Sequence, residues 1–275
     1  MTKEELLKQL MIMFPSGCSV TQRIKQVKQP RGGYINPKEF SLTKMGDGIE
    51  SLFPEENVPA GLVGLAVDYM TRFMSGAQPK EAFKISLMGA HIIKEDKNAL
   101  RLLDEIRDLD NRSIINAIKL SGYDVCYRAG EMGYKPVDEI NPDDATISNV
   151  ITMIERSLNF LNDYGPKVLD GFTFEGAYTD IISSGDGDFT TENTLWDFKV
   201  TKRPIRKEHT LQLLIYWRMG LHSIHPEFKR IKFLGIYNPR KNEVLRLDVS
   251  NIPQNLIVEI EKEVIGYDVG VKSTK

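Results

Sequence analysis

Apolar positions in the first 140 residues follow a helical period. Apolar side chains recur there at spacings of three and four, as on one face of an amphipathic helix. The segments with this period are 60–74, 80–94, 97–107 and 112–120, together with an N-terminal run at Leu6, Leu7, Leu10 and Phe14. Pro59 and Pro79 stand where two of these helices would begin, and Gly76 and Gly122 stand where two would end. The first half of the chain is therefore predicted to be mostly helical.

Residues 15–49 interrupt this pattern. They are rich in glycine and proline and show little periodicity, which predicts a loop or a loosely ordered arm. No acidic residue occurs between Glu5 and Glu39, and the basic residues of this stretch are Arg23, Lys25, Lys28 and Arg31. The arm is either a solvated polar loop or a segment that contacts phosphate groups.

From residue 141 onward, helical and extended patterns alternate. The predicted elements are a helix around 147–161, strands at 167–175, 177–183 and 194–201, a helix at 209–221, a strand pair at 231–237 and 243–249, and a closing helix at 253–265. Strands that alternate with helices in this way are typical of an α/β domain. We therefore predict a mostly helical domain over 1–140 and an α/β domain over 141–275.

Composition and charge narrow the possible classes of protein. A chain of 275 residues suits one large domain or two small ones, and with 41% hydrophobic residues a wholly disordered chain is not expected. The charge balance of 36 Lys and Arg against 38 Asp and Glu argues against a uniformly basic nucleic-acid coat but allows a local basic groove. Only two cysteines occur, Cys18 and Cys126, so this chain cannot supply a four-cysteine metal site or a disulfide framework. Reduced thiols and a cytoplasmic location are expected.

No membrane segment is predicted. The longest apolar stretch runs from 60 to 70 and is interrupted by Asp68, and it is far shorter than the roughly 20 residues that cross a bilayer. The N-terminal run contains charges and no cleavage site follows it, so it is interpreted as an amphipathic helix and not as a signal peptide.

The residues with the clearest chemical pattern lie between 175 and 216. Asp180 lies in a run that is otherwise apolar or small, and Asp197 and Lys199 stand two apart in the apolar run LWDFKV. Side chains two apart on a strand point to the same face, and charges on a buried strand need a partner. The partner is either structural, as an Asp–Lys pair, or a divalent cation held by Asp180 and Asp197 beside Lys199. Mg²⁺ prefers carboxylate and phosphate oxygens, and such a site could hydrolyse a phosphodiester.

Gln212 and Tyr216 share one face of the next predicted helix and could hydrogen-bond to that site. The order Asp180, then Asp197-Phe198-Lys199, then Gln212-x-x-x-Tyr216 resembles the PD-(D/E)XK nuclease superfamily, and most of all its RecB-like branch, over about residues 145–250. The resemblance implies a restriction-endonuclease-like core, a mixed sheet flanked by helices. It also implies Mg²⁺- or Mn²⁺-dependent hydrolysis of DNA, in recombination, repair or phage defence.

The same resemblance implies a role for each matching residue. Asp180 and Asp197 would bind the metal, with the main-chain carbonyl of Phe198 as a further ligand. Lys199 would orient or activate the attacking water, and Gln212 and Tyr216 would be an auxiliary pair.

The family also has a metal-binding side chain on its first core helix. Glu155 is the candidate here, with Glu175 as a rival, and the alternative for Glu155 is a solvated helix charge. No Fe–S cluster is expected, because only two cysteines are present. The chain has no phosphate-loop motif, so any unwinding of the substrate would need a separate helicase or other partner.

A basic run follows the predicted metal strand, and it comprises Lys199, Lys202, Arg203, Arg206 and Lys207. It is either a solvated loop or a rim that contacts phosphates, and its closeness to the carboxylates favours the rim. His209 is a possible substrate contact at the start of the helix predicted over 209–221. The stretch from Gly185 to Asp188 lacks the full pattern of a calcium loop and is interpreted as a hairpin turn.

Two other functions remain compatible with these motifs. One is a catalytically degenerate nuclease fold that serves as a binding module, and the other is an RNase of the same fold. The motifs also leave open whether cleavage is exo- or endonucleolytic.

Overall fold

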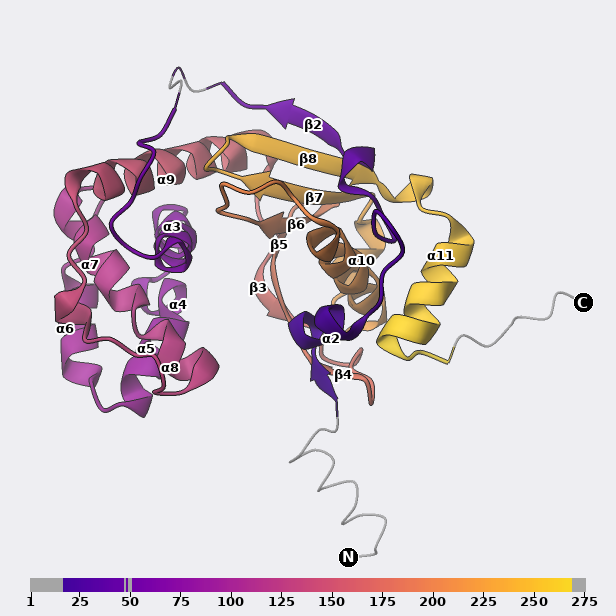
Figure 1. The fold of residues 1–275 in the computed structure, drawn as a ribbon, viewed down its shortest axis with the longest axis horizontal. Helices are drawn as coiled ribbons and strands as arrows, with labels where there is room; N and C mark the ends of the chain where they lie inside the picture. The colour runs from indigo at the N-terminus through magenta and orange to yellow at the C-terminus, as the bar shows by residue number, and fades with distance from the viewer. Residues whose placement is uncertain (1–16, 47, 49–50, 269–275) are drawn as a thin grey trace, which may run out of the picture.

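A computed structural model describes residues 17–46, 48 and 51–268 (Figure 1). The helix predicted at Leu6 to Phe14 lies outside the described residues. Figure 1 shows a lobe built of helices beside a lobe built around a sheet, and α9 (Asp144–Tyr164) runs from one to the other.

The helical lobe contains the predicted helices of the first half. They are α3 (Ala60–Met74), α4 (Pro79–Ala82) and α5 (Lys84–Ile92), which divide the segment predicted at 80–94, α6 (Asp96–Asp104) and α7 (Asn111–Ser121). The short helix α8 (Asp124–Ala129) follows them and was not predicted. Their buried faces meet around Met70 and Ile118, together with Val150 and Ile154 from the first half of α9. The second half of α9 packs Phe160 against Trp196 and Tyr237 of the sheet. The two lobes therefore share one long helix that is buried in both.

The other lobe holds a mixed sheet of six strands in the order β2-β8-β7-β6-β5-β3. The strands are β2 (Ser41–Lys44), β3 (Leu169–Thr173), β5 (Asp186–Thr190), β6 (Thr194–Phe198), β7 (Phe233–Asn238) and β8 (Glu243–Asp248). Within the described strands of this sheet, β6 and β7 are the parallel pair, and α10 (Lys207–His222) lies between them in the sequence, as a parallel connection requires. The lobe ends with α11 (Gln254–Glu259) and a π-helix at Ile260–Ile265. The predicted α/β class is confirmed.

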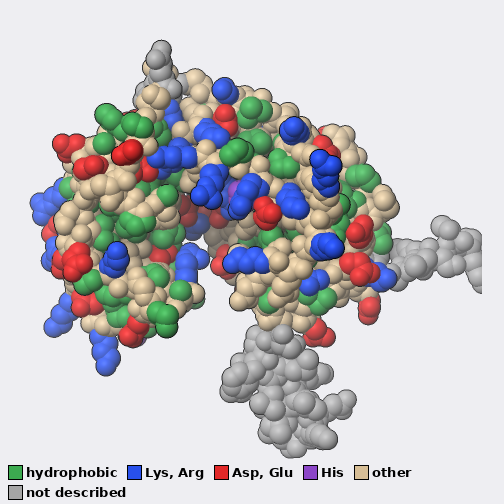
Figure 2. Space-filling view, in the orientation of Figure 1, with side chains coloured by type: hydrophobic (Ala, Val, Ile, Leu, Met, Phe, Trp, Pro, Cys, Tyr) green, Lys and Arg blue, Asp and Glu red, His purple; other side chains and the backbone are tan. Residues whose placement is uncertain are grey.

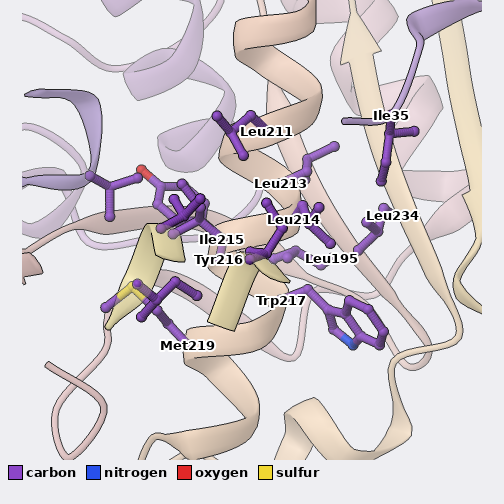
Figure 3. Packing of buried hydrophobic residues seen from close by; sticks show 14 of the residues in the cluster. Ile35, Leu195, Leu211, Leu213, Leu214, Ile215, Tyr216, Trp217, Met219 and Leu234 are labelled. Carbon is purple, nitrogen blue, oxygen red and sulfur yellow. The ribbon is translucent and has the colours of Figure 1, made fainter. Parts of the chain in front are cut away.

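The core of this lobe lies between the sheet and α10. Leu211 and Leu214 of α10 pack with Leu195 of β6 and Leu234 of β7, and Ile35 from the N-terminal arm joins them (Figure 3). Because side chains alternate along a strand, Trp196 points to the α9 side of the sheet while Leu195 and Asp197 point to the α10 side.

The N-terminal arm differs from its prediction. It forms β1 (Cys18–Ser19), α2 (Val20–Gln26), a 3₁₀ turn (Pro37–Glu39) and β2, and it packs on the α/β lobe. Val20 and Ile24 enter the same core as α10, and β2 pairs with β8 at the edge of the sheet. The predicted domain boundary at residue 140 therefore does not hold for this arm. Its strands are too short to show a period, and their partners are more than 150 residues away in sequence.

The second predicted strand is also displaced. The structure has β4 only at Ile182–Ser184, paired with β1 in a separate two-stranded sheet. The predicted hairpin turn at Gly185 to Asp188 is wrong, because Asp186–Thr190 is the sheet strand β5. Gly187 is needed for packing and not for a turn, since a Cβ there would lie 2.2 Å from the ring of Phe172. Within the described part of the chain, no helix has the length and apolar character needed to cross a membrane.

Candidate active site

Two carboxylates face each other on neighbouring strands of the sheet. Phe189 of β5 pairs with Trp196 of β6, so Asp188 and Asp197 stand opposite each other one step further along. The Asp197 side chain is 2% exposed. The main-chain N–H of Phe198 donates to Asp188 Oδ2 at 2.7 Å, which fixes the Asp188 carboxylate beside the end of β6.

A chain of polar contacts links this pair to α10. Lys199 Nζ lies 2.8 Å from Asp197 Oδ1 and donates to Gln212 Oε1 at 3.2 Å. Gln212 Nε2 in turn donates to the hydroxyl of Tyr216 at 2.9 Å. Tyr216 is buried against Phe174, with ring centroids 5.0 Å apart. The structure thus brings together Asp197, Lys199, Gln212 and Tyr216, which the sequence pattern had grouped.

Asp180 does not join them. It is exposed at a bend that precedes β4, and β4 belongs to the small sheet with β1. A cation shared by Asp180 and Asp197 would need the two residues on neighbouring strands, and the structure does not place them so; Asp188 is the carboxylate opposite Asp197. A signal for Asp188 was present in the sequence. It precedes Asp197 by nine residues, and the connection from 191 to 193 places the two opposite each other in an antiparallel pair.

One face of α3, in the helical lobe, lies beside the Asp188–Asp197 pair. Gly64, Asp68 and Arg72 are spaced by four and so share that face. A Cβ at Gly64 would lie 3.6 Å from Val200 beyond β6, while Arg72 Nε lies 3.8 Å from Asp170 Oδ1 of β3. Asp68, between them, accepts from Arg72 Nε at 3.2 Å and is among the charges that raise the pKa of Asp188.

Glu155 and its rival Glu175, the candidates for a further metal ligand, lie away from the Asp188–Asp197 pair. Glu155 is exposed on α9, on the face it shares with Asn159 and Asn162. Those two asparagines line a surface pocket with β2, at the edge of the sheet opposite to β3 and β5. The rival, Glu175, is exposed in the turn after β3. Asp68 is thus the helix carboxylate beside the pair.

Burial and charge shift the ionisation of the groups around the pair. Burial, followed by the charge of Asp197, raises the pKa of Asp188 to about 7. Burial alone would lower the pKa of Lys199, but Asp197 and Asp188 outweigh it, so the pKa of Lys199 is raised and it remains a cation. Burial raises the pKa of Tyr216, which stays a neutral phenol. Burial and then Lys199 lower the pKa of His209, whose Nδ1 accepts from the Arg206 N–H.

The residues around the pair fit a hard divalent cation. Among the described residues, Asp197 Oδ2 is buried without a hydrogen-bond partner, which is costly for an ionised carboxylate. Burial, and after it the charge of Asp197, raise the pKa of Asp188, and Lys199 offsets only part of this rise. The described parts of the chain contain no group of three or more His, Cys, Asp or Glu side chains arranged around a metal. Two carboxylates with water and phosphate oxygens are nevertheless a common way to hold Mg²⁺.

The basic residues lie in the loop between β6 and α10 and at the start of α10. Figure 2 shows Lys and Arg side chains gathered over this region, next to the notch that separates the two lobes. Arg203 and Arg206 are exposed, and Lys207 is half-buried with its Cβ against Gly33. Lys202 instead binds another part of the protein, since its Nζ donates to the carbonyl of Pro54 at 2.6 Å.

Comparison of the chain with protein-family models, curated proteins and solved structures finds no match. The function is therefore argued from the geometry of the site.

The raised pKa of Asp188 predicts a pH dependence of stability in the metal-free protein. In the unfolded chain this carboxyl ionises near pH ~4, and in the folded chain near pH 7. Between these values the folded state holds a proton that the unfolded state has released. The stability due to Asp188 is therefore fully present below pH ~4 and is lost as the pH rises through about 7.

Urea unfolding in EDTA at pH 5 and pH 8 measures this effect, and Asp188→Asn should flatten the difference between the two. Asp180→Asn is the control and should behave as the parent. Equal pH dependence in the parent and in Asp188→Asn would show that Asp188 ionises normally.

Proposed function

We propose that this chain is a metal-dependent nuclease of the PD-(D/E)XK type that hydrolyses phosphodiester bonds of DNA. The observation that carries the proposal is the Asp188–Asp197 pair, in which Asp197 is buried with one carboxylate oxygen unpartnered and has Lys199 beside it. The order of elements supports it as well. A helix (α9) is followed by three antiparallel strands (β3, β5 and β6), a helix (α10) and a strand parallel to β6.

Asp188 and Asp197 would hold Mg²⁺ or Mn²⁺, with Asp68 facing them from α3. The bound cation would supply charge stabilisation at the phosphate and a more acidic water. Phe198 contributes through its N–H, which orients Asp188. A ligand role for its carbonyl remains part of the proposal.

Lys199 is placed to act on the phosphate and on the attacking water. It remains charged, and its contacts with Asp197 and Gln212 direct its ammonium group to the carboxylate pair. A fixed cation beside a phosphodiester stabilises the negative charge that develops in the transition state. Gln212 and Tyr216 restrict the orientation of Lys199 through their own hydrogen bond.

The basic loop gives the substrate a path to the site. Arg203 and Arg206 are exposed beside the notch, where the phosphates of a nucleic acid could reach them. His209 is neutral and half-buried at the start of α10, so it can offer a hydrogen bond but no charge near neutral pH.

A substrate and metal panel tests this function. Labelled single- and double-stranded DNA and RNA are incubated with the protein in Mg²⁺, Mn²⁺ or EDTA. We expect cleavage of DNA with either metal and none in EDTA. Cleavage of RNA alone would identify an RNase. Nucleic-acid binding without cleavage in either metal would identify a binding module, and cleavage that persists in EDTA would overturn the metal-dependent reaction.

A further inference from the structure

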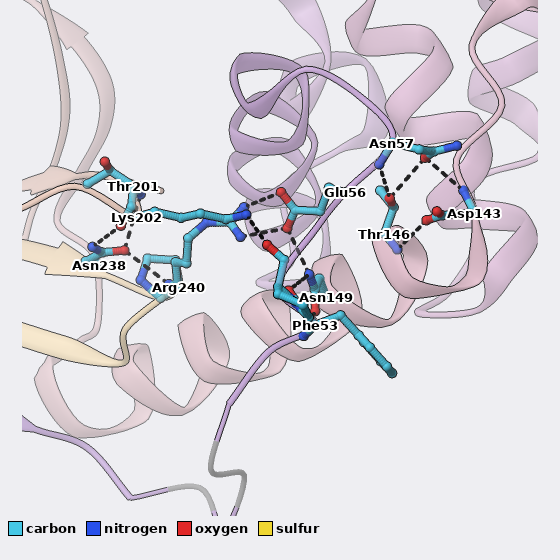
Figure 4. A network of polar contacts seen from close by, with 12 residues as sticks. Phe53, Glu56, Asn57, Asp143, Thr146, Asn149, Thr201, Lys202, Asn238 and Arg240 are labelled. Atoms are coloured by element: carbon cyan, nitrogen blue, oxygen red, sulfur yellow. Dashed lines mark hydrogen bonds and ion pairs between the residues drawn. The ribbon is translucent and has the colours of Figure 1, made fainter.

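The loop that follows Lys199 is held by a side chain where the strand ladder stops. β6 ends at Phe198, and Asn238 is the last residue of its parallel partner β7. Asn238 Nδ2 donates to the carbonyl of Thr201 at 2.8 Å, and Asn238 Oδ1 accepts from the N–H of Thr201 at 3.4 Å and of Arg240 at 3.1 Å. The Asn238 amide thus continues the pairing of the β6 chain beyond the end of the strand (Figure 4).

Arg240 connects this point to the segment that leads into α3. Its guanidinium binds both oxygens of Glu56, at 2.6 and 3.0 Å, and the two side chains are 6% and 4% exposed. Glu56 Oε1 also accepts from Asn149 of α9 at 3.0 Å. Asn149 in turn holds the main chain of Phe53 through both its N–H and its carbonyl. Residues 53–57 are therefore fixed to α9 and to the turn between β7 and β8.

Lys202 joins the loop from 200 to 206 directly to residues 53–57, through its bond to the Pro54 carbonyl. Figure 4 shows its side chain extended toward residues 53–56, alongside Arg240. Lys202 is exposed, and this hydrogen bond turns its ammonium group toward residues 53–57.

Both linked segments lead directly into the site. Residues 53–57 precede α3, whose face carries Asp68 and Arg72, and the loop from 200 to 206 follows Lys199. A buried ion pair is weak evidence for a gain in stability, because desolvation offsets the attraction, so its placement suggests another use.

We propose that Glu56, Arg240, Asn238 and Lys202 form a positioning clamp that fixes α3 against the end of β6. The clamp sets Asp68 of one lobe and Lys199 of the other relative to the carboxylate pair. Lys202 belongs to this clamp and makes no phosphate contact. The catalytic part of this inference rests on the proposed nuclease function, whereas the mechanical part does not.

A matched pair of variants tests the clamp. Glu56→Gln keeps the size of the side chain but leaves Arg240 without its counter-ion. Glu261→Gln does the same to Arg218, in a buried pair that joins the π-helix to α10 away from the clamp. Both variants should lose thermal stability. Only Glu56→Gln should lower kcat at least about tenfold, at temperatures where circular dichroism shows both variants folded. Parental kcat in folded Glu56→Gln would overturn the positioning role.

Hydrogen exchange provides a readout that does not depend on cleavage. In Glu56→Gln, amide exchange should accelerate in residues 200–206 and at the start of α3, and it should not do so in Glu261→Gln. Unchanged exchange in both segments would overturn the clamp whether or not the protein is a nuclease. If the parent cleaves nothing while exchange changes as expected, the nuclease proposal fails and the clamp stands.

The role of Lys202 is tested by the salt dependence of DNA binding. Arg203→Met should reduce the slope of log K against log salt by about 0.7–0.9, the contribution of one phosphate contact. Lys202→Met should leave this slope unchanged and accelerate exchange in residues 53–57. An equal loss of slope in both variants would make Lys202 a phosphate contact and remove it from the clamp.

Discussion

Asp188→Asn is expected to reduce cleavage at least about a hundredfold, whereas Asp180→Asn should cleave at the parental rate. Asparagine keeps the volume of Asp188 and can still accept the Phe198 N–H, so the change removes mainly the negative charge. Loss of one preorganised charged group at a reacting centre costs on the order of 10²–10³ in rate. Asp180 is exposed and lies on no strand of the main sheet, so the same substitution there should be silent.

Measurements of thermal stability and of metal binding show whether the loss of cleavage comes from misfolding or from a weaker metal site. At pH 8 in EDTA, Asp188→Asn should melt at a higher temperature than the parent, because it relieves the repulsion with Asp197. Calorimetric titration with Mn²⁺ should show weaker binding in Asp188→Asn and parental binding in Asp180→Asn. Loss of cleavage in Asp180→Asn with parental activity in Asp188→Asn would show that Asp180, and not Asp188, binds the metal.

The sequence predicted best the elements whose pattern is local. Helix α10 and strand β6 are continuous apolar-rich stretches of sequence, so Asp197, Lys199, Gln212 and Tyr216 could be grouped correctly. Asp188 was missed because its flanking glycines indicate a turn, whereas Gly187 makes room for the ring of Phe172. That reason becomes visible only when β3 is placed beside β5. The edge strand β2 could not be predicted either, since it pairs with β8, which is far away in the sequence.

Asp68 is conspicuous in the sequence, but the sequence alone does not indicate its role. It is the charged residue inside the longest apolar stretch, and a charge in an apolar setting requires a partner. Its ion-pair partner Arg72 is one turn further on in the same helix, but its place beside the carboxylate pair became clear only from the path of α3, which brings Gly64 to Val200 and Arg72 to Asp170. The helical lobe therefore places one of its own carboxylates near the Asp188–Asp197 pair.

Lys199→Met should show whether the Asp197–Lys199 pair serves the fold alone or flanks a metal site. If the pair is only structural, the substitution leaves a buried carboxylate without its cation and destabilises the fold. The loss for a buried pair is roughly 3–5 kcal/mol, and less is expected here because the Lys199 side chain is 25% exposed. If the pair flanks a metal site, Mg²⁺ can neutralise Asp188 and Asp197 in place of the ammonium.

We therefore expect Lys199→Met to melt below the parent in EDTA and close to it in saturating Mg²⁺. It should bind DNA yet cleave it at least about a hundredfold more slowly, because the fixed cation that stabilises the transition state is gone. Thermal melts with and without Mg²⁺, combined with single-turnover cleavage, measure both effects. Arg101→Met, which breaks an ion pair with Glu105 on the surface of the helical lobe, is the control and should change neither. A large loss of stability that Mg²⁺ does not restore, with cleavage intact in the folded fraction, would show that Lys199 serves the fold and not the reaction.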